Sequence, residues 1–169
     1  LALLIQEVLE IGTIKINQVN AVAISAGPGS YTGLRIGTST AKGICYALKT
    51  PLIAVNTLDL LSFQASHDAI ITKALLCPMI DAKRMEVYCQ VTHAAFKVIS
   101  PVEAKVIDET SFAELLTSNK MFFFGDGAQK CKDSITHPNA VFLDNIFPKA
   151  SALGRMAENK FTEGQFEEL

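Results

Sequence analysis

A glycine-rich turn at residues 26–37 is the part of this chain whose residue types and spacing could bind an anion. The apolar run 21–24 before it is typical of a buried strand, and residues 34–48 after it keep helical spacing. Backbone N–H groups are free at such a helix start, where the helix dipole also favours negative charge. The pattern predicts a strand, a tight turn and a helix capped by Ser30, with phosphate as the first ligand to consider.

The turn matches neither of the two best-defined phosphate loops. The dinucleotide pattern G-x-G-x-x-G would need glycine where Thr32 stands. A nucleotide-hydrolase loop would need lysine and a hydroxyl residue after its last glycine, where Leu34 and Arg35 stand. We therefore expect at most a weak nucleotide site, shared with a second glycine turn further along the chain. Its residues would be Gly27, Gly29, Ser30, Gly125, Asp126 and Gly127.

Small residues recur at every fourth position of the predicted helix, at Gly33, Gly37, Ala41 and Cys45. One stripe of the helix therefore carries little side-chain bulk, and a second helix could pack closely against it. Glycine inside a helix costs roughly 0.5 to 1 kcal/mol relative to alanine, which suggests a compensating close contact. The spacing leaves two partners equally open, a helix of the same domain and a helix of another molecule.

The composition is that of a globular protein with one ordinary domain or two small lobes: 169 residues, 49% hydrophobic, with a net charge of −2. No basic stripe supports a large nucleic-acid surface, so any RNA contact should be shared or indirect. The four cysteines form no C-x-x-C pair and the three histidines have no metal-ligand spacing. We expect core cysteines, no metal site, no membrane span and a cytoplasmic protein.

The elements that position these residues follow from hydrophobic periodicity and turn signals. A helix at 1–10 carries apolar residues on more than one face, which suggests that a second side is covered. The remaining expected elements are a strand at 52–55, a helix from Thr57 to about 69, hairpin strands at 74–80 and 85–92, strands near 96–99 and 105–107, a helix capped by Thr110 or Ser111 and reaching 116, a strand at 121–124 followed by a short helix, and a helix at 151–161 ended by Gly164.

We divide the chain into a partial N-terminal lobe at 1–70, a C-terminal lobe at 71–150 and a C-terminal helical segment at 151–169 that packs back toward the first lobe. A cleft between the lobes is then a candidate site. The charged turn of the hairpin could be a solvated tip or a contact with a partner or tRNA. Its residues are Asp81, Lys83, Arg84 and Glu86. Asp81 and Asp126 are more typical of turn formers than of catalysts.

Two segments, 21–56 and 80–88, resemble the TsaB family, also called YeaZ. The first contains S-A-G-P-G-S-Y-T-G-L-R-I-G at 25–37 and P-L-I-A-V-N at 51–56. The resemblance implies an α/β fold of two ribonuclease-H-like lobes, of the actin-like ATPase and sugar-kinase-like type, with the opening strands of the first lobe lacking. It also implies a role in forming threonylcarbamoyladenosine at position 37 of tRNA.

The related TsaD proteins carry two metal-binding histidines, four residues apart, after the same Val-Asn pair. Here those positions are Thr57 and Leu61, which are a poor metal ligand and no ligand at all. The resemblance thus implies a non-catalytic partner and activator of TsaD, with no catalytic residue and no metal of its own. It further implies TsaE as a partner, a homodimer when alone, tRNA contacted indirectly, and ATP or ADP only in the complex.

The resemblance and the stripe of small residues place the partner interface on the helices at 1–11 and 32–48. Its expected residues are Leu1, Leu4, Ile5, Val8, Thr32, Gly33, Ile36, Gly37, Thr40 and Ala41. Two alternatives stay open. One is a small kinase-like nucleotide enzyme that uses both glycine turns. The other is a glycoprotease-like protein of the M22 type, against which Thr57 and Leu61 argue.

Overall fold

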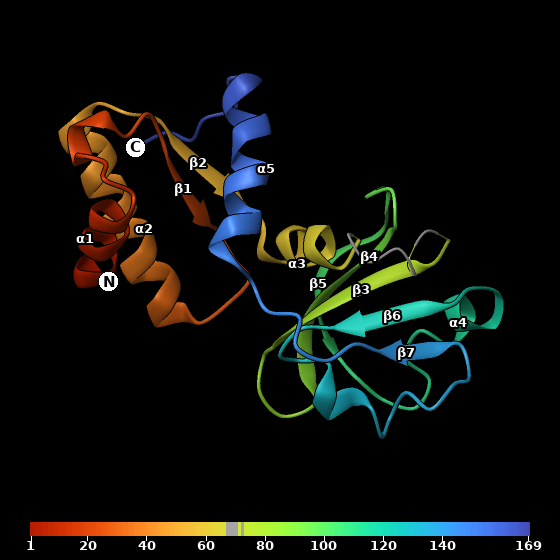
Figure 1. The fold of residues 1–169 in the computed structure, drawn as a ribbon. Helices are drawn as coiled ribbons and strands as arrows, with labels where there is room; N and C mark the ends of the chain where they lie inside the picture. The colour runs from red at the N-terminus through yellow and green to blue at the C-terminus, as the bar shows by residue number, and fades with distance from the viewer. Residues whose placement is uncertain (67–70, 72) are drawn as a thin grey trace.

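The computed structural model of the chain describes residues 1–66, 71 and 73–169, and these form two β-sheets flanked by helices (Figure 1). The smaller sheet pairs two parallel strands, with Val22 opposite Leu52. A parallel pair needs a crossover connection, and a long helix supplies it. The elements of this part are α1 (Ala2–Ile11), η1 (Ile16–Gln18), β1 (Val22–Ser25), α2 (Tyr31–Leu48), β2 (Leu52–Val55) and, from the far end of the chain, α5 (Ala150–Thr162).

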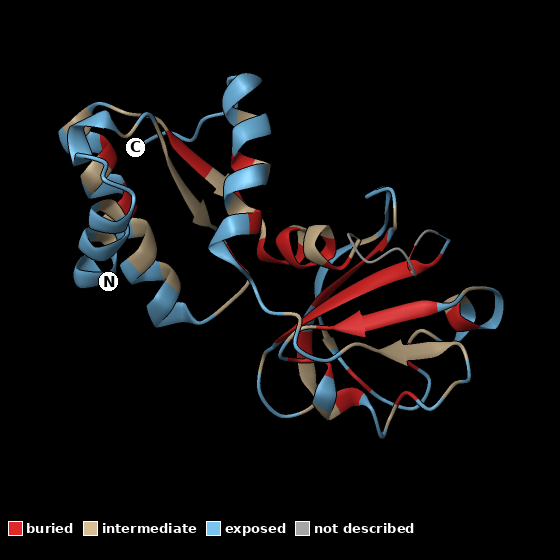
Figure 2. Cartoon of the chain, viewed as in Figure 1, coloured by how far each residue is buried: buried red, intermediate tan, exposed pale blue. Residues whose placement is uncertain are grey.

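The larger sheet has five strands in the order β5-β4-β3-β6-β7. Its central strand, β3, runs antiparallel to β4 and parallel to β6. Strands β3 and β6 are buried along almost their whole length (Figure 2), as expected for strands covered on both faces. The elements are α3 (Thr57–Ser66), β3 (Leu75–Asp81), β4 (Glu86–His93), β5 (Val98–Val106), α4 (Ala113–Ser118), β6 (Met121–Phe124), η3 (Gln129–Cys131) and β7 (Ala140–Phe142).

Hydrophobic cores lie on both faces of the larger sheet. On one face α3 packs Leu58 and Leu61 in a cluster with Leu76 of β3. On the other face Met79 and Phe123 belong to a second cluster, with residues of α4 and η3. Because successive residues of a strand point to opposite faces, β3 and β6 contribute side chains to both cores.

Helices α2 and α5 both pack on the smaller sheet. The buried Ala41 and Cys45 of α2 lie in a cluster with Leu52 of β2. Helix α5 places Ala152 in a cluster with Val55. The end of the chain therefore returns to strands that lie near its start. Among the described residues, no helix has the length and apolar character to cross a membrane.

Several predicted elements are confirmed. Ser30 caps α2, where its Oγ accepts a long hydrogen bond of 3.4 Å from the N–H of Gly33. Strands β3 and β4 form the predicted antiparallel hairpin. Helix α5 ends just before Gly164, whose φ of 69° lies in the left-handed region that glycine favours.

The predicted cap of α3 is wrong. Asn56, not Thr57, caps this helix, and its Oδ1 accepts the N–H of Leu58 at 2.8 Å. Thr57 is the first helical residue, and its hydroxyl instead lies 2.7 Å from Ser25 Oγ at the end of β1. The predicted last residues of this helix, 67–69, lie outside the described residues.

Strand β5 is one continuous strand where the sequence predicted two, near 96–99 and 105–107. It contains Pro101, which cannot donate a backbone hydrogen bond. β5 lies at the edge of the sheet, where such a residue is tolerated. The short strand β7 was not predicted at all, since its three residues are too few to show a period.

Thr110 and Ser111 do not cap α4, which begins at Ala113. Each of their hydroxyls donates instead to the carboxylate of Asp108, at 2.9 Å. These hydrogen bonds hold the pKa of the Asp108 carboxyl below its usual range, with the Ser111 hydroxyl as the largest cause. The hydroxyl residues therefore stabilise the turn that precedes the helix.

The second glycine turn lies directly on β3. Gly125 has a φ of 99°, and a side chain there would overlap the carbonyl oxygen of Met79. A Cβ on Gly127 would come within 2.8 Å of the carbonyl carbon of Ile80. Both glycines are required by the close approach of two backbones.

The substitution Gly125→Ala should lower the free energy of unfolding by roughly 2 to 3 kcal/mol, because it combines a left-handed backbone with overlap at Met79. Gly37→Ala is the matched control, since a Cβ there meets no atom within 4 Å. It should raise the free energy of unfolding by roughly 0.5 to 1 kcal/mol. Urea denaturation measures both, and equal stability of the two variants would contradict the assigned packing.

All four cysteines are free and buried. Burial raises the pKa of the Cys77 and Cys131 thiols, which lowers the fraction of reactive thiolate. Because all four side chains are buried, Ellman's reagent should modify none of them in the native protein and all four after unfolding in guanidinium chloride. A thiol that reacts rapidly in the native protein would show that one of the cores is assigned incorrectly.

Candidate functional site

A cavity of about 710 Å³ lies between the first glycine turn and the tip of the β3–β4 hairpin. We call it the turn–hairpin cavity. The start of α2 lines it with Ser30 and Tyr31, and the hairpin lines it with Asp81 and Lys83. Thr57, at the start of α3, also lines it. Its volume is in the range of small-molecule sites, so the geometry allows a ligand here.

The first glycine turn is held against the start of α3. Gly27 is buried with a φ of 103°, which favours glycine at this position. Its carbonyl oxygen accepts the N–H of Thr57 at 2.8 Å. Gly29 and Ser30 then line the cavity. The turn therefore offers two of its three predicted nucleotide-binding residues to the cavity.

The second glycine turn offers less to a ligand. The N–H of Gly127 donates to the carbonyl of Met79 at 3.1 Å, so it is already used within the chain. Asp126 lines the cavity, and its Oδ1 accepts the N–H of Asp81 at 3.0 Å. Gly125 lines a neighbouring cavity of about 510 Å³. Backbone packing explains why this turn contains two glycines, and phosphate binding is not needed to explain them.

Thr57 and Leu61, which the resemblance places where TsaD proteins carry metal-binding histidines, both lie in the interior. Thr57 is 5% exposed and its hydroxyl is hydrogen-bonded to Ser25. Leu61 is fully buried in the apolar cluster under α3. Within residues 1–66, 71 and 73–169, no group of three or more His, Cys, Asp or Glu side chains is placed to hold a metal ion.

Asp81 is the acidic residue most firmly held in the cavity wall. The Lys130 ammonium group, hydrogen-bonded to its carboxylate, holds the pKa of Asp81 below its usual range. Lys130 also donates to the carbonyl oxygen of Glu86 at 2.7 Å, across the hairpin. The carboxylate of Asp81 is therefore ionised at neutral pH and bonded to groups of its own chain, as the turn-former interpretation predicts.

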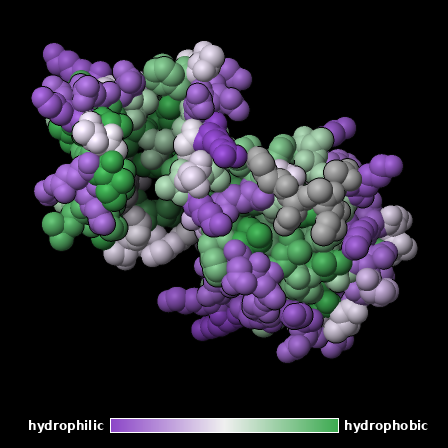
Figure 3. All heavy atoms as spheres, viewed as in Figure 1, coloured by the Kyte–Doolittle hydropathy of each residue, from purple (hydrophilic) through white to green (hydrophobic). Residues whose placement is uncertain are grey.

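Helix α1 carries a stripe of exposed apolar side chains. None of its residues is buried. Four of them lie at helical spacing, and Figure 3 shows hydrophobic atoms on the surface of this part of the molecule. They are Leu1, which directly precedes the helix, and Leu4, Val8 and Ile11, with 56%, 61%, 68% and 77% of their surface exposed. Contiguous exposed apolar residues on a folded chain indicate a contact surface.

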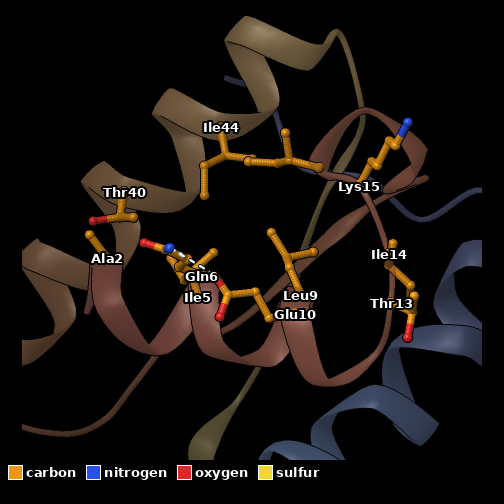
Figure 4. A pocket seen from close by; sticks show the side chains of 11 residues that line it. Ala2, Ile5, Gln6, Leu9, Glu10, Thr13, Ile14, Lys15, Thr40 and Ile44 are labelled. Atoms are coloured by element: carbon orange, nitrogen blue, oxygen red, sulfur yellow. Dashed lines mark hydrogen bonds between the residues drawn. The ribbon is translucent and has the colours of Figure 1, made fainter.

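A second cavity, of about 790 Å³, separates α1 from part of α2. Figure 4 shows Ile5 and Leu9 of α1 pointing toward Thr40 and Ile44 of α2. Two residues expected at the interface, Ile5 and Thr40, thus line a cavity between the two helices. The sequence-based expectation omitted Leu9 and Ile44, although both continue the helical spacing of Ile5 and Thr40.

The stripe of small residues on α2 is divided between two environments. Ala41 and Cys45 are 3% and 0% exposed because the smaller sheet covers them. Ala41 was expected at the partner interface, and its burial against its own sheet corrects that expectation. Gly37 faces open space, with no atom within 4 Å of a Cβ built there. Thr32, Gly33 and Ile36 are exposed, as an interface on this part of α2 requires.

Known proteins resemble this chain in sequence and in fold. A family model for TsaD, described as tRNA N6-adenosine threonylcarbamoyltransferase, matches residues 1–147. The tRNA threonylcarbamoyladenosine biosynthesis protein TsaB of Bacillus subtilis is 37% identical over 70 residues, which are 41% of this chain and 29% of that protein. The Escherichia coli protein of the same name is 35% identical over 85 residues, 50% of this chain and 36% of that protein.

The chain thus spans 29% and 36% of the length of these two curated relatives. Among solved structures, YeaZ from Pseudomonas aeruginosa superposes with a TM-score of 0.80 at 22% identity, covering 97% of this chain and 76% of that chain. This likeness shows a mixed α/β fold of the YeaZ type. Because the family model covers residues 1–147, the chain belongs to the TsaD family, and the curated members that it resembles are TsaB proteins.

Proposed function

We propose that this chain is part of a TsaB-type subunit that binds a TsaD-type transferase and supports threonylcarbamoyl transfer to adenosine 37 of tRNA, without a catalytic residue of its own. The observation that carries the proposal is an exposed apolar surface on α1 and α2, which we call the helical face. Its residues are Leu1 just before α1, Leu4, Val8 and Ile11 of α1, the exposed Thr32, Gly33 and Ile36 of α2, and the partly buried Gly37.

The spacing of α2 makes this surface continuous. Gly33, Gly37, Thr40 and Ile44 recur at three or four residues and so lie on one side of the helix. Thr40 and Ile44 face α1 across the 790 Å³ cavity, whereas Gly37 has no atom within 4 Å of a Cβ position. A partner helix could therefore lie over the glycines and continue along the exposed side of α1.

The energetics favour such a contact. Full burial of one leucine or valine side chain contributes roughly 1.5 to 3 kcal/mol. Leu4 and Val8 are 61% and 68% exposed, so most of that contribution is still available to a partner. Glycine at positions 33 and 37 removes the bulk that would hold a second helix at a distance, which allows close backbone packing.

The rest of the proposed assembly comes from the resemblance to TsaB proteins. We infer an actin-like division in which the smaller sheet with α1, α2 and the returning α5 forms one ribonuclease-H-like lobe and the larger sheet forms the other. Because α3 packs on the larger sheet, the boundary lies at the start of α3 rather than at the expected residue 70. Without a TsaD-type partner, the helical face would pair with a second copy of the chain. TsaE is proposed as a further member of the complex. The complex would act in the cytoplasm. ATP or ADP would bind weakly at the turn–hairpin cavity, and only in the complex.

Gly37→Leu tests the proposed interface. No atom lies within 4 Å of the Cβ position, so the isolated protein should keep its fold, measured by circular dichroism and thermal unfolding. The bulky side chain should prevent close helix packing and weaken binding to the TsaD-type partner at least tenfold, measured by gel filtration of the mixture and by calorimetry.

Lys42→Leu is the matched control. Lys42 is exposed and lies five residues beyond Gly37, about 140° away around α2 and outside the helical face. This variant should bind the partner as the wild-type protein does. Unchanged co-elution of the Gly37→Leu variant with the partner would sink the proposed interface.

A further inference from the structure

The tip of the β3–β4 hairpin holds two cationic residues in an unfavourable backbone conformation. Lys83 and Arg84 have φ values of 70° and 47°, in the left-handed region that normally selects glycine or asparagine. Consecutive long side chains in this region are uncommon, and such strain often accompanies function. The turn thus retains two cations at a position where glycine would fit the backbone better.

The base of this turn is fixed from several sides. The Asp81 carboxylate is hydrogen-bonded to Lys130 and accepts the N–H of Lys83 at 3.1 Å. The Asp81 N–H donates to Asp126 at 3.0 Å, and Lys130 reaches the carbonyl of Glu86 at 2.7 Å. The second glycine turn and η3 therefore hold both strands of the hairpin, and the two cations stand on a rigid base.

The two cationic side chains are exposed, and nothing in the described part of the chain forms an ion pair or side-chain hydrogen bond with either of them. Lys83 lines the turn–hairpin cavity together with Tyr31 and Tyr88, which are 73% and 38% exposed. The guanidinium carbon of Arg35 lies 5.4 Å from the centre of the Tyr31 ring. The cavity thus presents one cation, Lys83, and two exposed aromatic rings at its mouth, while Arg84 follows Lys83 on the exposed tip and Arg35 contacts Tyr31.

We propose that this mouth contacts an unpaired segment of RNA directly, with Lys83 and Arg84 on phosphates and Tyr31 stacked on a base. Exposed aromatic rings beside cations are the combination that single-stranded nucleic acids select, because bases stack and phosphates need positive charge. The inference rests on the proposed function for the choice of RNA, since tRNA is the proposed substrate. It goes beyond an indirect role toward tRNA.

The charges of the site favour a small contact. Glu86 and Asp126 also line the cavity, and the net charge of the chain is −2. Asp81 and Asp126 are held by hydrogen bonds within the chain, so the free cations lie at the tip. An acidic protein surface could use these cations but would leave the exposed rings of Tyr31 and Tyr88 without a role. RNA uses both kinds of group.

The double variant Lys83→Asn, Arg84→Gly separates RNA binding from folding. Asparagine and glycine suit left-handed backbone, so the midpoint of thermal unfolding should stay the same or rise. Binding of a fluorescently labelled anticodon-arm RNA to the complex of the full-length protein with its TsaD-type partner should weaken about tenfold. The slope of log affinity against log salt should fall by about 1.4, for two phosphates on a single strand.

Two further variants complete the test. Lys97→Glu changes the net charge of the chain by as much as the double variant does. Lys97 is exposed in the turn that connects β4 to β5, at the opposite end of β4 from the hairpin tip, so this variant should leave RNA binding unchanged. Tyr31→Ala should weaken RNA binding about tenfold without changing the salt slope, because stacking involves no phosphate.

Each outcome decides between the two proposals. Unchanged RNA affinity and salt slope in the double variant, with co-elution of the partner retained, would overturn the RNA contact and leave the proposed function intact. Loss of co-elution in the double variant would assign the tip to the protein partner and also overturn the RNA contact. Failure of the proposed function is read separately, from retained partner binding by Gly37→Leu.

Discussion

The packing of the second glycine turn on strand β3 is the constraint on which the rest of the structure depends. β3 is buried on both faces and pairs with strands on both edges. The glycines at 125 and 127 let the backbone after β6 lie directly on it. That contact places Asp126 on the N–H of Asp81, and so fixes the end of β3 and the hairpin that follows. Asp81 and Asp126 both line the turn–hairpin cavity, so this contact also positions one wall of that cavity.

Glycine serves three different purposes in this chain. At 27 it allows a left-handed turn, and at 125 and 127 it allows two backbones to approach closely. At 33 and 37 it leaves one side of α2 without bulk; a Cβ on Gly33 would contact Ser30 at 3.5 Å, whereas no atom in the described part of the chain lies within 4 Å of a Cβ on Gly37. The first two purposes are satisfied within the chain. The third is not explained by a contact within the described part of the chain, and the proposed function therefore places a partner helix there.

The helical face and the hairpin tip share a physical property. Each is less favourable for the isolated chain than an alternative sequence would be: apolar side chains of α1 lie in water, and Lys83 and Arg84 adopt positive φ values. Interactions that are unfavourable locally are common where a surface has a role in binding. The larger sheet contrasts with both surfaces, because its strands β3 and β6 are buried and apolar cores cover its two faces.

Sequence alone determined the elements whose pattern is local: the apolar runs of β1, β3 and β6, the alternation of β4, the periodicity of α1, α2 and α5, and the cap at Ser30. It could not determine choices that depend on a distant neighbour. Whether Thr57 capped its helix depended on Ser25, 32 residues away. Whether Ala41 was open or covered depended on the smaller sheet. Only the tertiary structure decided these, because burial and hydrogen-bond partners are properties of the folded chain rather than of a segment.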